Sequence, residues 1–473
     1  MPAYGSVLAN PNGRIATNRW DGNPGFDRLN RTQYQVGYLA EHRFNDAFTL
    51  RQNFRYAHSE GYYRQLYGTF GANLLPDYRT VQRSTTGSDV SFDSITVDTH
   101  LQSKFDTGPL GHTLLTGIDY YNTSSRTFSG FDAVAPSYDL YAPNFGSIAT
   151  RPLTYQTNAR QTQNSLGFYA QDQIRFGRLA LQLGGRYDRY DSTTETETFA
   201  TRRTTRSEQE VGAFTGRAGL VYLFDNGLAP YVSYAESFEP QSGTFSPARG
   251  AGAFEPTTGR QYEAGLRYQP PGTNALFSAA VFDITRQNVL TTDPNDNRYS
   301  VQTGEVRSRG IELEAKASLA TGLEVIGAFT YLDNEVTSSN ATVTENRGIA
   351  GAPTPTRPER GTTPVGVPSV LGSVWANYSF QQDTALEGLG LGGGVRYVGS
   401  SWGDTANTLK VPDYTLVDLS ARYNLGKLGA ANTELQLNVS NLFDTEYVST
   451  CNTYAWCWYG FHRSVLATLR HRF

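Results

Sequence analysis

The stretch Leu179–Tyr190, which reads LALQLGGRYDRY, decides the fold class of this chain. Its side chains change character at every step. One face carries Leu179, Leu181, Leu183, Gly185 and Tyr187, and the other carries Ala180, Gln182, Gly184, Arg186 and Asp188. Because successive side chains of a β-strand point to opposite faces, this pattern predicts a strand with one apolar and one polar face.

The same alternation recurs along the chain, with no helical stretch between the repeats. Further examples are IELEAKASL at Ile311–Leu319, TLVDLSARYNL at Thr415–Leu425 and TELQLNVS at Thr433–Ser440. Any one of these strands would also fit a soluble sheet with one wet face. The whole chain, however, predicts about seventeen of them, which is more than an open sheet usually holds before it curls or closes.

The connections between the expected strands alternate in length. Tight turns are expected at residues 44–46, 176–178, 224–227, 270–273 and 320–322. Long connections are expected at residues 129–155, 191–207, 240–256, 336–367 and 448–461. Tight turns at one end and long, extracellular loops at the other are typical of outer-membrane barrels. We therefore predict an all-β fold, a transmembrane antiparallel β-barrel.

Composition fits a barrel and disfavours other classes. The 473 residues include 30 Tyr, 25 Phe, 5 Trp and 47 Gly, and the hydrophobic fraction is 38%. The mean hydropathy is −0.46, and no apolar run approaches the roughly 18 residues that a membrane helix needs. Transmembrane strands hide their apolar residues at alternate positions, so a barrel remains compatible with these values. The net charge of −4 argues against nucleic-acid binding.

Two motifs are considered and set aside. GLGLGGG at Gly388–Gly394 has the spacing of a dinucleotide loop, but the pattern continues as a strand where that loop needs a helix. Its glycines suit a crowded barrel wall or a site where another group approaches the backbone closely. DPNDN at Asp293–Asn297 lacks the glycine and the final glutamate of a calcium loop and predicts a polar turn. No catalytic arrangement is found, so we do not expect an enzyme.

The two cysteines, Cys451 and Cys457, lie at the tip of the last long connection. An extracellular face is oxidising, which favours a disulfide over two free thiols. Such a bridge would restrict Tyr454 and Trp456, and a rigid loop that carries aromatic residues is a reasonable ligand contact. The final strand ends on the aromatic residue Phe473, an ending similar to the signal that the barrel assembly machinery reads.

Several long blocks resemble the TonB-dependent siderophore receptors, and the ferrichrome branch in particular. The blocks are NVSNLFDTEYVSTCNTYAWCWYGFHRSVLAT, YLFDNGLAPYVSYAESFEPQSGTF, GRQYEAGLRYQP, GEVRSRGIELEAKASL and VDTHLQSKFDTGPLGHTLLTGIDY. The resemblance implies an outer-membrane barrel of about 22 strands filled by an N-terminal plug. It also implies uptake of ferric siderophores with energy passed from TonB.

The chain departs from this family at its N-terminal side. The plug, the TonB-contacting segment and the signal peptide are not found, and about five barrel strands are missing by the strand count. We expect residues 1–32 to be the remnant of an extracellular loop and residues 33–473 to be the C-terminal portion of the barrel. The first strand is expected near Gln33–Phe44.

The resemblance also implies a ligand site between the plug and the aromatic residues of the upper barrel. By position, the candidates are Tyr78, Tyr141, Phe145, Tyr454 and Trp456. The alternative for each is an ordinary loop aromatic or a residue of the interfacial belt. Asn452 stands where the family has an aromatic residue. No protein group should bind iron directly, because the siderophore fills its coordination sphere, and no cofactor is expected.

These observations predict an outer-membrane receptor of a Gram-negative bacterium for ferric siderophores of hydroxamate type, such as ferrichrome. Expected partners are the siderophore, outer-membrane lipid, the barrel assembly machinery, and TonB through the missing plug only; no nucleic acid is expected, and the protein should be a monomer. Two alternatives remain. One is a passive pore formed by the truncated barrel, and the other is a non-functional fragment with two unpaired edge strands.

Overall fold

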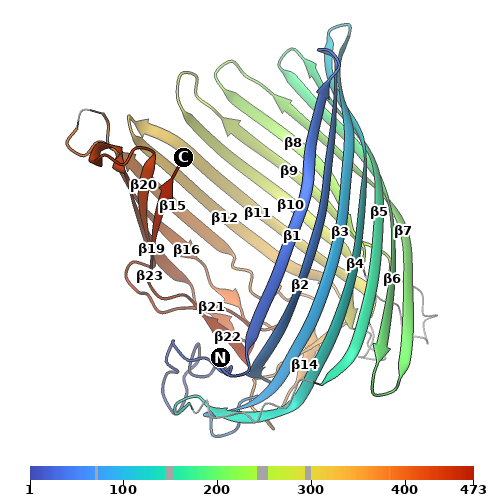
Figure 1. Ribbon diagram of the computed structural model, residues 1–473, viewed down its shortest axis with the longest axis vertical. Helices are drawn as coiled ribbons and strands as arrows, with labels where there is room; N and C mark the ends of the chain where they lie inside the picture. Colours follow the sequence, from blue (N-terminus) through green and yellow to red (C-terminus); the bar gives the residue numbers. More distant parts are fainter. Residues whose placement is uncertain (70–72, 144–153, 242–253, 293–299, 383, 473) are drawn as a thin grey trace.

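The computed structural model describes residues 1–69, 73–143, 154–241, 254–292, 300–382 and 384–472. Their main feature is a 17-stranded antiparallel sheet, which confirms the predicted fold class and strand number (Figure 1). Its strands are β1 (Arg28–Arg43), β2 (Phe48–Gly68), β3 (Thr80–Thr107), β4 (Leu110–Asp139), β5 (Tyr155–Phe176), β6 (Leu179–Thr198), β7 (Arg203–Tyr222), β8 (Leu228–Glu239), β9 (Thr257–Tyr268), β10 (Ala275–Thr292), β11 (Ser300–Ala320), β12 (Leu323–Ser338), β15 (Val370–Ser379), β16 (Leu389–Val398), β19 (Tyr414–Asn424), β20 (Thr433–Ser440) and β23 (Ser464–His471).

The remaining elements are short and lie in the connections. They are the pairs β13 (Thr342–Thr344) with β14 (Thr356–Pro358), β17 (Ser401–Trp402) with β18 (Lys410–Val411), β21 (Val448–Thr453) with β22 (Trp456–Tyr459), and the 3₁₀ turn η2 (Leu425–Leu428). In the described part of the chain, no helix has the length and apolar character needed to cross a membrane.

Each strand of the sheet pairs with its neighbour in the chain, so the connections alternate between two ends. The predicted tight turns, such as the one between Phe176 and Leu179, gather at the upper end in Figure 1. The N-terminal segment and the hairpin β21–β22 gather at the lower end. We call these the short-turn end and the long-loop end.

Two predicted long loops begin inside strands of the large sheet that continue well past the predicted boundary. β4 continues to Asp139, which pairs with Thr80, and β6 pairs with β7 as far as Thr198 and Arg203. The loop boundaries at residues 129 and 191 were therefore wrong. Apolar alternation fades where both faces of a strand meet water, but backbone pairing continues there, helped by pairs such as Arg206–Glu195 at 3.3 Å. β1 likewise begins at Arg28, before the expected Gln33.

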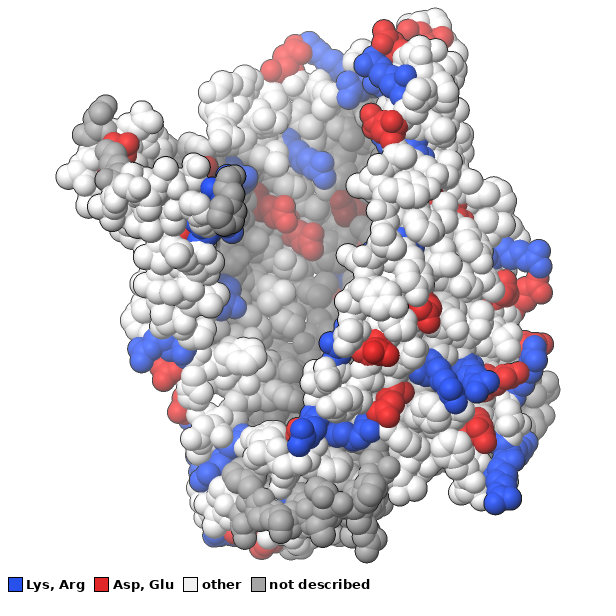
Figure 2. Space-filling model, viewed as in Figure 1, with Lys and Arg blue, Asp and Glu red and all other residues white. Residues whose placement is uncertain are grey.

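The two faces of the sheet have opposite chemistry, as the alternation predicts. Leu183 keeps 45% of its surface exposed on the outer, apolar face. On the inner face, Arg186 of β6 reaches over β5 to Asp119 of β4, with Nη2 2.9 Å from Oδ1. Charged side chains are visible inside the hollow of the sheet in Figure 2. The polar face therefore lines a lumen, and the apolar face is suited to lipid.

A boundary on the outer face marks where the apolar belt ends toward the long-loop end. In β6 the outward residue Tyr187 is followed by Arg189, and in β9 Tyr262 is followed by Arg260. Aromatic residues that give way to charged residues are typical of a membrane–water interface. We call this level the outer boundary.

Four of the five glycines of the rejected dinucleotide motif belong to strand β16, and Gly388 lies in the turn before it. The indole of Trp375 on β15 lies across them, because a Cβ at Gly392 would come within 2.7 Å of the Trp375 ring. A Cβ at Gly394 would lie 2.8 Å from the carbonyl oxygen of Val374. The motif thus serves close approach within the barrel wall, and the strand assignment is confirmed. The DPNDN stretch lies outside the described residues.

The sheet has a seam between its first and last strands. β1 pairs with β2 and β23 pairs with β20, and no pairing joins β1 to β23, whose residues are all among those described. Every residue of both strands is exposed. The seam is the gap between them in Figure 1 and the open side of the hollow in Figure 2.

Candidate functional site

A compact cap covers part of the long-loop end. It consists of the N-terminal segment, residues 1–27, and the hairpin β21–β22. Cys451 and Cys457 face each other in that hairpin and are joined by a disulfide, with Cα atoms 4.0 Å apart. The backbones of Met1 and Cys457 exchange two hydrogen bonds, of 2.6 and 2.7 Å. The N-terminal segment therefore adds to the hairpin as a third extended segment.

Buried apolar residues fix the cap to the sheet. The disulfide packs against Ala3, Leu409 and Val411, all of which are buried. Leu409 and Val411 belong to the connection between β16 and β19. Burying such side chains stabilises the contact by about 25 cal/mol for each Å² of apolar surface removed from water. The cap is thus part of the folded core at this end.

A cluster of tyrosines joins the cap to the neighbouring connections. Tyr4 lies edge-on to Tyr78, with ring centroids 5.3 Å apart, and 6.3 Å from the ring of Tyr454. Tyr141 donates its hydroxyl to the carbonyl oxygen of Gly13 at 2.6 Å. Burial raises the pKa of Tyr4 and of Tyr141. Both hydroxyls therefore stay protonated, and that of Tyr141 acts as the hydrogen-bond donor.

An aromatic cavity of about 300 Å³ lies beside the cap on the inner-face side of β2 and β3. Its lining residues are Met1, Asp21, Gln65, Tyr67, Thr86, Trp456 and Trp458. Trp456 stands edge-on to Tyr67 at 5.8 Å, and its Nε1 donates to the carbonyl oxygen of Gly68 at 2.9 Å. This bond fixes the indole so that it presents its ring to the cavity. Trp458 keeps 48% of its surface exposed.

Charged groups of both signs lie at this cavity, because the α-ammonium group of Met1 and the nearby Arg83 guanidinium both interact electrostatically with Asp21. Asp21 is the one carboxylate among the described lining residues, and none of them is Lys or Arg. The Asp21 carboxylate accepts a hydrogen bond of 3.0 Å from the backbone N–H of Gly68. Aromatic faces, one amide and a carboxylate with positive groups beside it suit a neutral ligand with apolar parts.

The structure brings together four of the five predicted ligand-binding residues. Tyr78, Tyr141 and Tyr454 lie in the tyrosine cluster, and Trp456 lines the aromatic cavity. Tyr454 is only 5% exposed and donates to Thr408 Oγ1 at 3.2 Å, so its ring is used in packing. Phe145 and Phe473 lie outside the described residues. The ligand contacts themselves stay predictions.

Sequence reasoning missed several residues of the aromatic cavity. Trp458 could have been found, because it alternates with Trp456 about Cys457 and so shares its face of the hairpin. Asp21 and Tyr67 carry no such signal. They reach the cavity from segments hundreds of residues away, through pairing that no local pattern reveals. Among the described residues, no group of His, Cys, Asp or Glu side chains could hold a metal ion.

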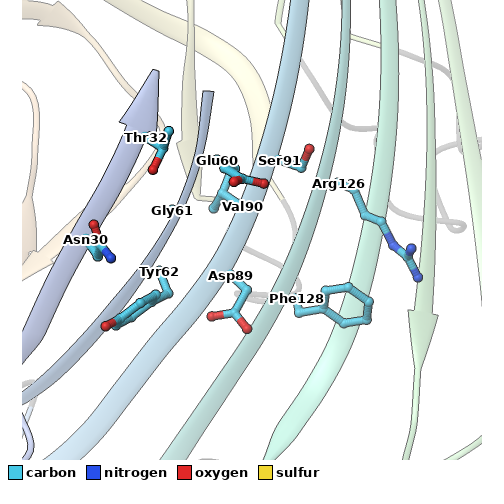
Figure 3. A pocket seen from close by; sticks show the side chains of 10 residues that line it. All are labelled: Asn30, Thr32, Glu60, Gly61, Tyr62, Asp89, Val90, Ser91, Arg126 and Phe128. Atoms are coloured by element: carbon cyan, nitrogen blue, oxygen red, sulfur yellow. The ribbon is translucent and has the colours of Figure 1, made fainter. Parts of the chain in front are cut away.

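A second cavity, of about 400 Å³, lies on the outer face of β1–β4, between the apolar belt and the long-loop end. Figure 3 shows its side chains in rows across these neighbouring strands. Asp89 is paired with Arg64 at 2.8 Å, and the Arg126 guanidinium lies 4.5 Å from the ring centre of Phe128. Because this groove faces away from the lumen, it is separate from the aromatic cavity.

Comparison with known proteins identifies the family. The description "TonB dependent receptor-like, beta-barrel" matches residues 2–442. The ferrichrome outer membrane transporter/phage receptor of Escherichia coli K12 is 37% identical over 497 residues, covering 100% of this chain and 63% of that protein. The ferrioxamine B receptor of Salmonella typhimurium is 34% identical, also over 100% of this chain and 63% of its own length.

The fold also matches solved structures. The ferric-catecholate import receptor Fiu of E. coli K12, in its closed form, superposes with a TM-score of 0.82 at 23% identity, over 99% of this chain and 69% of that one. This chain spans 63% of the length of each of the two curated receptors named above. By name, the first of these relatives is an outer membrane transporter and receptor and the second is a receptor, so neither is an enzyme, which agrees with the expectation from the sequence. The chain belongs to the TonB-dependent receptor β-barrel family.

Proposed function

We propose that this chain forms the barrel portion of an outer-membrane receptor that takes up ferric siderophores of the hydroxamate type. The aromatic cavity at the long-loop end carries the proposal, because its rings suit the apolar surface of a wrapped iron complex. In this orientation the long-loop end is extracellular and the short-turn end is periplasmic.

The charge of the cavity supports hydroxamates over catecholates. A ferric tris-hydroxamate is neutral, or cationic when it carries a free amine, whereas a ferric tris-catecholate is an anion. No Lys or Arg side chain among the described residues lines the cavity to pair with the anion, whereas the rings of Trp456 and Trp458 suit the neutral complex. The two sequence relatives named above for ferrichrome and ferrioxamine B agree with this choice.

Uptake would need parts beyond this chain. Energy from TonB would reach the ligand through a plug domain held in the lumen, against the polar inner face. The siderophore would bring its own iron coordination, so the protein would contribute contacts to the organic shell only. Phe473 would present the C-terminal signal to the barrel assembly machinery, and the apolar outer face would contact lipid.

Binding of a ferric hydroxamate to the receptor purified from native outer membranes tests the proposal. We expect ferrichrome to quench tryptophan fluorescence and to bind by calorimetry, and Trp456→Ala to weaken binding about thirty-fold, as for a central aromatic contact of about 2 kcal/mol. Phe461→Ala is the matched control, because Phe461 follows the same hairpin but is 90% exposed and outside the cavity.

The possible outcomes test the ligand class, the position of the binding site and the receptor function separately. Preferential binding of a ferric tris-catecholate would contradict the hydroxamate assignment and leave the receptor function standing. Unchanged ferrichrome affinity in Trp456→Ala would move the ligand away from the aromatic cavity. No response to a panel of ferric siderophores would overturn the function itself.

A further inference from the structure

The barrel wall parts between β7 and β8. β7 pairs with β6 along its whole length, from Arg203 to Tyr222, and β8 pairs with β9 along its whole length. β7 and β8, however, pair with each other only from Arg217 opposite Ala235 to Val221 opposite Tyr231. Toward the long-loop end, from Gly216 and Glu236 onward, no ladder pairing joins the described residues of the two strands. Farther along, the Gln209 side chain of β7 donates to the carbonyl oxygen of Gln241, just after β8, at 2.7 Å.

A cavity lies on each side of the place where this pairing stops. The inner-face cavity, of about 490 Å³, is lined by residues that include Asp119, Arg186 and Arg217. The other cavity, of about 240 Å³, lies in the gap and reaches the outer-face residues Thr258 and Arg260. Both cavities are lined by Thr215 and Glu236. The two cavities are therefore adjacent and lie on either side of these two residues.

Glu236 lies between these two cavities and replaces part of the missing strand pairing. Its Oε2 accepts the backbone N–H of Gly216 at 2.9 Å, and its Oε1 accepts the hydroxyl of Tyr234 at 2.6 Å. In a paired sheet the Gly216 N–H would be bonded to a backbone carbonyl of β8. A side chain can be withdrawn more readily than a strand, so this contact acts as a latch.

The gap lies at the outer boundary of the membrane belt. Phe214 is the next outer-face residue of β7 after Gly216 toward the long-loop end, and it is 68% exposed. It pairs with Tyr187, the last apolar residue on the outer face of β6 in that direction. Backbone groups without a partner strand must be hydrated, because burying them in lipid would cost several kcal/mol each. The polar lining, with Thr215, Glu236 and Ser237, is suited to water.

We propose that the wall has a water-filled side opening between β7 and β8, latched by Glu236. It gives small polar molecules a route between the outer boundary and the inner-face cavity at Arg186 and Arg217 that does not pass the cap. The opening is a property of the wall and holds whichever ligand the aromatic cavity binds.

The rate of thiol modification in lipid vesicles tests the opening. The two native cysteines form a disulfide, so an introduced thiol is the reactive one. Gly216→Cys places an outward thiol at the gap. Gly185→Cys, directly opposite on β6, and Ala218→Cys, two residues deeper on β7, are matched outward controls in paired wall. The probe is the small cationic reagent methanethiosulfonate ethylammonium.

We expect Gly216→Cys to react about ten-fold faster than either control. Adding Glu236→Ala should raise its rate further, and adding Ser237→Phe, which fills the gap, should lower it to the rate of the controls. Equal rates at the three positions, or no effect of Ser237→Phe, would overturn the proposal. Each variant is first checked for folding by heat-modifiable gel mobility.

The unmodified protein provides a second measurement. Backbone amides of β7 from Arg203 to Gly216 should exchange with deuterium faster than those of the β6 residues with which they pair. Equal protection of the two strands would count against an opening, because a fully paired β7 would be protected on both edges.

Discussion

Gly394 has no room for a side chain, because its Cβ would meet the Trp375 ring and the Val374 carbonyl oxygen. We expect Gly394→Ala to lower the free energy of unfolding by about 1–3 kcal/mol, as overpacking does. Gly372→Ala on the neighbouring strand is the control, because no atom lies within 4 Å of the added Cβ. Urea unfolding in lipid vesicles measures both changes, and equal midpoints would contradict this packing.

Tyr459 ties the hairpin to the N-terminal segment, and its hydroxyl donates to the carbonyl oxygen of Ile15 at 2.7 Å. Burial raises the pKa of Tyr459 to about 12, against about 10 in an unfolded chain. Because the folded pKa is the higher one, this contribution is fully present below about pH 10 and is lost as pH rises through about 12.

We therefore expect protease cleavage within residues 1–27 to accelerate between about pH 10 and 12. An alkaline-stable subtilisin can be used to measure it. Tyr459→Phe removes both the hydrogen bond and this titration, so its cleavage should start faster and rise less over the same range. The same pH profile in both proteins would show that Tyr459 does not hold the segment.

Two of the predicted site residues, Tyr454 and Trp456, are indicated by the spacing of the cysteines. A cystine loop restricts both side chains, and the hairpin that carries them forms part of the cap. Their separate uses, Tyr454 in packing and Trp456 in the cavity, depend on which face of a two-stranded hairpin meets Ala3 and which meets Tyr67. That choice is made by long-range pairing of Met1 with Cys457, which no local pattern contains.

The strands of the membrane belt were predictable because one face meets lipid and the other water, which forces the period of two. Their extensions beyond the belt were not. Past Asp191 in β6, and toward Asp139 in β4, both faces are wet and the apolar signal fades while the ladder continues. The sequence also does not predict where β7 and β8 stop pairing, because both strands keep a normal alternation of apolar and polar residues past that point.

The β6 alternation predicts opposite effects for neighbouring substitutions. Leu183→Arg would place a charge on the lipid face in the middle of the belt and should cost about 2–4 kcal/mol of stability in a bilayer. Gln182→Arg, one residue earlier, faces the lumen and should change stability by less than about 0.5 kcal/mol. Unfolding in lipid vesicles distinguishes them, and equal costs would contradict the assignment of faces.

The seam bears on whether residues 1–473 could act alone as a pore. Both edge strands expose their backbone groups along their whole lengths, and in lipid each unpaired group costs several kcal/mol. We expect residues 1–473, refolded alone in detergent, to give no heat-resistant compact band on a gel and no steady conductance in planar bilayers. A compact band with stable ohmic steps would support the pore reading instead.

The direction of the two edge strands adds a rule of parity. β1 starts at the long-loop end with Arg28, and β23 also starts there, with Ser464, because seventeen alternating strands make the first and the last point the same way. Joined directly, they would form a parallel ladder in an otherwise antiparallel wall. Two copies inserted in the same orientation meet the same obstacle. Antiparallel closure needs an odd number of further strands. Any segment that closes the seam must therefore supply an odd number of strands, and each outermost one must run antiparallel to the edge strand it joins.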